Sequence, residues 1–154
     1  MKRSLLSLPA LALAASLLAG CGGSDGSDGK DSAPEPDASA IASADFVSEA
    51  NQICADGNAE VDSASAELGD APTEEDVSAF ARDVLVPNIQ GQHDAIAELG
   101  APEGDQDAVD ALLTALQDGI DALTADPTVV SVSPGPFADA NAAATELGLT
   151  ECAG

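Results

Sequence analysis

Cysteine and histidine are the side chains of this sequence that are best suited to chemistry, and they are few. There are three cysteines, Cys21, Cys54 and Cys152, and one histidine, His93. A thiol can be acylated, can form a disulfide or can bind a metal, and a histidine can carry a proton near neutral pH. Zinc sites need several Cys or His ligands, so this set does not predict a zinc or haem centre. We therefore expect no cofactor and no metal site.

A polar stretch around Pro87 contains the histidine. Asn88, Gln92 and His93 lie within this short segment. The favoured interpretation is a polar helix face beside a kink. The alternative is the wall of a small cleft in which these three side chains face a ligand. A lone histidine without a placed nucleophile does not make a catalytic site, so we expect the protein not to be an enzyme.

Acidic residues dominate the sequence, with 28 Asp and Glu against 4 Lys and Arg and a formal net charge of −24. Because phosphate backbones are bound through Lys and Arg, nucleic acid is excluded as a partner. Acid clusters at 74–76 and 103–107 suit divalent cations, but helix N-termini also favour acids. A divalent-cation-responsive acidic surface protein is therefore the alternative function. We expect Arg82 to pair with a carboxylate rather than to anchor an anionic ligand.

The first 20 residues have the layout of an export signal, with a basic start, an apolar stretch at 5–18 and small residues before Cys21. This layout resembles the bacterial lipoprotein signal, in which the chain is cut before an acylated cysteine. The resemblance implies palmitate or similar acyl chains on Cys21 and anchoring at the extracytoplasmic face of the cell membrane. An ordinary secretory signal is the alternative. A transmembrane anchor is disfavoured because Pro9 and two serines interrupt a short apolar run.

Composition divides the rest of the chain into a tether and a domain. Residues 21–44 are mostly Gly, Ser, Asp, Ala and Pro, which cannot bury enough apolar surface to order the chain. We expect a flexible, disordered tether there. Residues 25–31 are only distantly similar to a calcium loop, because the EF-hand spacing and its closing Glu are absent. From residue 45 onward the apolar residues follow a helical period, so 45–154 is the predicted acidic domain.

Start and stop signals divide this domain into four helices. They run from Ser43 or Asp45 to Gly69, from Thr73 to Gly100, from about Asp105 to Ala125, and from Pro136 to a Schellman stop at Gly148. Pro87 is expected to kink the second helix because it removes a backbone hydrogen bond. Residues 128–133 have a strand-like composition but no partner strand, so we expect an extended connection. Four amphipathic helices with short connections predict an all-α, up-down-up-down four-helix bundle.

The two cysteines of the domain fit this bundle. Cys54 lies in the third turn of the first predicted helix, and Cys152 lies just after the fourth. An antiparallel bundle brings these places close together, and an exported protein meets an oxidising environment. We therefore expect a Cys54–Cys152 disulfide, with two free thiols or a metal pair as alternatives.

Four short segments resemble a family. They are FVSEANQIC at 46–54, VLVPNIQ at 84–90, LGAP at 99–102 and LGLTEC at 147–152. Together they resemble a group of small secreted or lipid-anchored proteins of actinobacteria, with an early F-x(6)-IC helix and a late LGL-x-x-C ending. The resemblance implies a helical fold, paired cysteines and a cell-envelope location, and it carries no activity. The sequence thus predicts a lipid-anchored, non-enzymatic module that binds an envelope protein or a small ligand.

Overall fold

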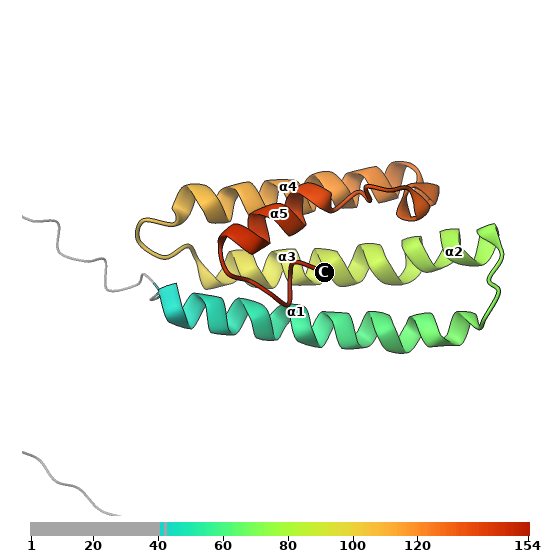
Figure 1. Cartoon of the computed structure of the whole chain (residues 1–154), viewed down its shortest axis with the longest axis horizontal. Coiled ribbons are helices and arrows are strands. Elements are labelled where there is room, and N and C mark those ends of the chain that lie inside the picture. The colour runs from blue at the N-terminus through green and yellow to red at the C-terminus, as the bar shows by residue number, and fades with distance from the viewer. Residues whose placement is uncertain (1–40, 42) are drawn as a thin grey trace, which may run out of the picture. The chain divides into compact units, whose positions relative to one another are not determined.

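A computed structural model describes residue 41 and residues 43–154 of the chain. The predicted signal, Cys21 and most of the predicted tether lie outside the described residues. Figure 1 shows the elements, which are α1 (Ser43–Ser65), the 3-10 turn η1 (Ala66–Leu68), α2 (Glu74–Phe80), the π turn η2 (Ala81–Leu85), α3 (Val86–Leu99), α4 (Gln106–Ala125), the 3-10 helix η3 (Pro127–Ser131) and α5 (Ala138–Glu146). No helix of the described part is both long enough and apolar enough to cross a membrane.

All the described secondary structure is helical, so the prediction of an all-α bundle is confirmed. The helices pack in chain order, α1 on α3, α3 on α4 and α4 on α5. The stricter up-down-up-down order stays a prediction. The core is formed where these helices meet, by Phe46, Ala50, Ile96, Leu112 and Leu149, each at most 1% exposed. The apolar period of the sequence therefore marks the faces that the helices bury against one another.

The start of α2 follows the sequence signal closely. The Thr73 backbone N–H donates to Asp76 Oδ2 at 2.9 Å, and the Asp76 N–H donates to Thr73 Oγ1 at 3.2 Å. This reciprocal pair is a capping box, which satisfies backbone groups that the first turn of a helix leaves without partners. The predicted start of this helix at Thr73 is confirmed, with Thr73 as its N-cap.

The helix is irregular next to Pro87, where the sequence predicts a kink. Because proline has no backbone N–H, the Asp83 carbonyl cannot receive the usual bond from four residues later. The chain accommodates this with the π turn η2 directly before α3, where the Val86 N–H donates to the Ala81 carbonyl. The place of the irregularity is therefore predictable, but its π geometry is not.

The connection after α4 corrects the sequence-based expectation of an extended segment. Residues Pro127–Ser131 form the 3-10 helix η3. Asp126 nucleates it, because Asp126 Oδ1 accepts from the Thr128 N–H at 3.0 Å and from the Thr128 hydroxyl at 2.6 Å. Such side-chain caps favour a turn, and the two valines that follow have no strand to pair with.

The last helix starts later than expected and ends as predicted. α5 begins at Ala138, two residues after the expected start at Pro136. Gly148 has a φ of 75°, and the Leu149 N–H donates to the Ala144 carbonyl at 2.8 Å. These are the marks of a Schellman stop, which turns the fully buried Leu149 back onto the helix.

Candidate functional site

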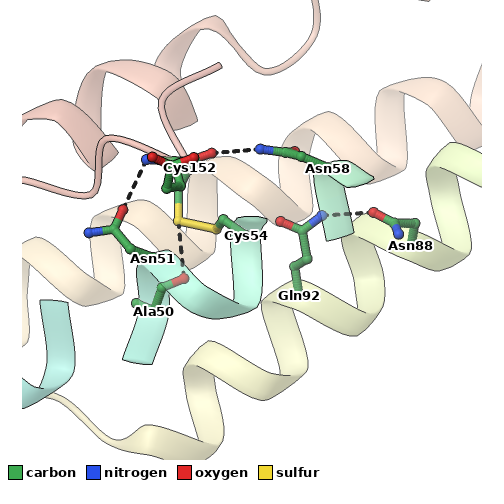
Figure 2. The surroundings of a disulfide bond; sticks show 8 residues. Ala50, Asn51, Cys54, Asn58, Asn88, Gln92 and Cys152 are labelled. Atoms are coloured by element: carbon green, nitrogen blue, oxygen red, sulfur yellow. Dashed lines mark hydrogen bonds between the residues drawn. A yellow bond between two sulfur atoms is a disulfide. The ribbon is translucent and has the colours of Figure 1, made fainter. Parts of the chain in front are cut away.

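The disulfide is the centre of the best-defined group of polar contacts in the domain. Cys54 and Cys152 are joined by a 2.03 Å S–S bond across 98 positions of sequence, with their Cα atoms 5.1 Å apart. Cys54 is 2% exposed, on α1. Figure 2 shows the bond between α1 and the segment that follows α5. The predicted pairing is confirmed.

Two asparagines of α1 flank the disulfide and hold the same residue of the C-terminal segment. The Glu151 N–H donates to Asn51 Oδ1 at 2.9 Å, and Asn58 Nδ2 donates to the Glu151 carbonyl at 2.8 Å. Both bonds appear in Figure 2 on either side of Cys152. We call Asn51, Asn58 and the Cys54–Cys152 bond the C-terminal clamp. It fixes the end of the chain on α1 by one covalent bond and two hydrogen bonds.

The asparagines of the clamp were missed from the sequence, although a signal was present. Asn51 precedes Cys54 by three positions and Asn58 follows it by four. Residues at these spacings share one face of a helix. Two asparagines on the same face as a predicted disulfide cysteine therefore indicate side chains that can hydrogen-bond to the segment carrying the other cysteine.

Two of the predicted ligand-binding residues join helices together. Asn88 Nδ2 donates to the Gly57 carbonyl at 3.2 Å and to Glu60 Oε2 at 3.1 Å, and Gln92 Nε2 donates to Asn88 Oδ1 at 2.7 Å. Figure 2 shows Gln92 and Asn88 reaching toward each other from α3, beside α1. A Cβ atom on Gly57 would lie 2.3 Å from Gln92 Nε2, so this glycine makes room for the amide. Asn88 and Gln92 are thus engaged in α1–α3 packing.

His93, the third predicted residue, lines a different surface. It borders an open groove of about 530 Å³ between α3 and α4, together with Asp110, Leu113, Thr114, Gln117 and Asp118. His93 Nδ1 lies 2.9 Å from Asp94 Oδ1, and this bond, followed by one from Gln90, lowers the pKa of Asp94. A histidine–carboxylate pair fixes the orientation of an imidazole, but no hydroxyl of the described part hydrogen-bonds to this ring. The structure therefore does not bring His93 together with Asn88 and Gln92.

Arg82 departs from the expected ion pair. It is exposed on the π turn η2, and no carboxylate of the described residues forms an ion pair with it. An exposed guanidinium is well hydrated and gains little from a single surface carboxylate, so the missing pair carries little cost.

The acid clusters form helix caps and solvent-exposed surface in the described part of the chain. Asp76 belongs to the capping box, where the Thr73 hydroxyl and then the Thr73 N–H hold its pKa below the ordinary value. Asp105, at the start of α4, accepts from the Ser43 hydroxyl at 3.1 Å. Within residues 43–154, no group of three His, Cys, Asp or Glu side chains has the geometry to hold a metal ion.

Comparisons of the chain with protein-family models, with curated proteins and with solved structures found no match. The resemblance to small envelope proteins of actinobacteria therefore stays a prediction.

Proposed function

We propose that the protein is a lipid-anchored, non-enzymatic interaction module at the extracytoplasmic face of the cell membrane. The observation that carries this proposal is the Cys54–Cys152 disulfide, which is the bond that an exported chain forms and a cytosolic chain rarely keeps. The signal-like start that ends in Cys21 supports the same location and supplies the anchor. The charge supports binding of a positively charged partner, because an acidic surface attracts cations and repels phosphate backbones.

The anchoring half of the proposal is tested at Cys21. We expect the wild-type chain, expressed in a bacterium that processes lipoproteins, to incorporate an alkyne-tagged palmitate and to sediment with membranes. Cys21→Ser should take up no label, because the thiol that is acylated is gone. Cys54→Ser combined with Cys152→Ser is the matched control, since it removes the two disulfide-bonded cysteines and should keep the label. An unlabelled wild-type chain, or equal label in Cys21→Ser, would overturn the proposed anchor.

A further inference from the structure

The two halves of the bundle are packed unequally. The buried residues of α1 lie between Phe46 and Gly57, and the remaining turns of that helix contribute none. α2 contributes no buried residue. The nine-residue α5 lies along the half of the bundle away from α2 (Figure 1). On the α2 half the shorter 3-10 helix η3 packs against α2 and η2 in place of α5.

A groove runs along this less covered half, between the end of α1 and the α2–η2 segment. Its apolar wall includes Leu68, Phe80 and Val84, all of which are only partly buried, and the open groove has a volume of about 270 Å³. We call it the α1–α2 groove. Its volume lies just below the range for small-molecule sites, which begins at about 300 Å³. It is therefore better suited to one or two side chains of a larger partner than to an enclosed ligand.

Carboxylates form the edge of the α1–α2 groove. Glu67, Asp76 and Asp83 all line it and are all exposed. The rest of the domain reinforces their charge, since 23 acids and one base, Arg82, lie between residue 45 and the C-terminus. An apolar floor with an acidic edge complements an apolar side chain flanked by Lys or Arg, and it repels acidic segments and anionic lipid headgroups.

We propose that the α1–α2 groove docks a basic amphipathic helix of a protein partner. The partner helix places an apolar side chain between Leu68 and Phe80 and its Lys or Arg residues against Glu67 and Asp83. A helix is the occupant because the groove lies between helices, and recognition of this kind seats the apolar face of one helix in a groove of another protein. This inference rests on the proposed function and names the partner that the interaction module takes.

The test uses the oxidised chain from Gly22 to Gly154 and a synthetic 18-residue helix with Leu on one face and Lys on the other. A charge-reversed twin, with Glu for every Lys, is the control peptide. We expect the basic peptide to shift the NMR amide signals of Leu68, Phe80 and Val84, and the twin to shift none of them. Glu67→Lys combined with Asp83→Lys should weaken binding at least tenfold, because it reverses the edge of the groove.

The control for bulk charge is Glu49→Lys combined with Glu146→Lys, which makes the same change in net charge on two exposed residues outside the groove. We expect this control to change binding by less than threefold. Equal weakening by the two pairs, shifts that map elsewhere, or no binding at millimolar peptide would overturn the assignment of the groove. Palmitate labelling at Cys21 does not depend on the groove. A negative result in one experiment therefore does not refute the proposal that the other experiment tests.

Discussion

Asn58 and Glu151 stand 93 positions apart in the sequence, yet the Asn58 side-chain amide donates a 2.8 Å hydrogen bond to the Glu151 carbonyl oxygen. Asn51 Oδ1 accepts a hydrogen bond from the N–H of the same glutamate, so both backbone polar groups of Glu151 are bonded to α1. Between these contacts lies the disulfide, and just before it lies the fully buried Leu149. The C-terminal clamp therefore attaches the segment after α5 to α1 and keeps Leu149 in the core.

The clamp asparagines are expected to matter locally more than globally. Asn51→Ala combined with Asn58→Ala should cost about 1–3 kcal/mol of unfolding free energy in total, since each hydrogen bond is worth about 0.5–1.5 kcal/mol. Amide hydrogen exchange at residues 150–153 should speed up more than exchange in α4, because α4 responds only to the loss of global stability. Gln52→Ala is the control, because the Gln52 amide donates to Asp56 within α1 and forms no hydrogen bond with the C-terminal segment. Unchanged exchange at 150–153 would show that the disulfide alone holds the segment.

The domain is expected to be more stable with Gly119 in α4 than with alanine there, although alanine has the higher helix propensity. A Cβ atom there would lie 2.4 Å from the Phe137 ring and 2.9 Å from the Pro136 carbonyl oxygen. Gly119→Ala should therefore destabilise the domain by about 1–3 kcal/mol, the usual cost of overpacking. Gly91→Ala is the matched control, because no atom lies within 4 Å of the added methyl group. It should stabilise by up to about 1 kcal/mol, measured by chemical denaturation. Two substitutions of the same sign and size would contradict this packing.

The capping box predicts an acid-sensitive contribution to stability. The Thr73 contacts hold the pKa of Asp76 below its ordinary value of 3.8 in the folded chain. A lowered carboxyl pKa stabilises the fold fully at higher pH, and the contribution disappears as the pH falls through the folded value. Wild type should therefore melt above Asp76→Asn at pH 7, and the two melting temperatures should converge below pH 3.8. Asp62→Asn controls for the loss of one negative charge. A gap between the two melting temperatures that widens as the pH falls would contradict a lowered Asp76 pKa.

The acidic surface predicts a dependence on ionic strength. From residue 45 onward, 23 acids face a single base, so the folded domain repels itself in dilute buffer. The melting temperature should rise with NaCl up to roughly 0.1–0.2 M, where the screening length falls to about 10 Å or less. CaCl₂ at matched ionic strength should give the same rise, because the described acids form no preformed metal group. A melting temperature that falls with NaCl would refute the repulsion, and a much larger calcium shift would favour the cation-responsive alternative.

Much of the fold follows from local signals in the sequence. Thr73 with Asp76, and Gly148 with Leu149, are capping patterns that depend on neighbouring residues, so the ends that they mark are predictable. The short 3-10 helix after Asp126 escaped prediction because β-branched valines favour an extended chain unless a side-chain cap holds the turn. The extended preference of the valines and the turn-favouring cap of Asp126 compete there, and composition does not show which of the two prevails.

The candidate site was less predictable than the helices. The spacing of Asn88, Gln92 and His93 places them on one segment, but neighbours 57–60 on α1 and 110–118 on α4 decide which surface each side chain meets. Gly119 shows the same limit, because a glycine inside a helix indicates weakness until its partner Phe137 is known. Contacts between helices that are distant in sequence carry this information, and periodicity alone does not.

The most direct test of the central claim is the intact mass of the protein recovered from its own cell envelope. The account predicts a chain that begins at Cys21, carries two or three acyl groups and is two hydrogens lighter than its reduced form. Reduction should restore those two hydrogens and expose Cys54 and Cys152 to a thiol reagent. A chain that still carries residues 1–20, or that lacks acyl groups, or that has two free thiols before reduction, would contradict a lipid-anchored and disulfide-clamped envelope module.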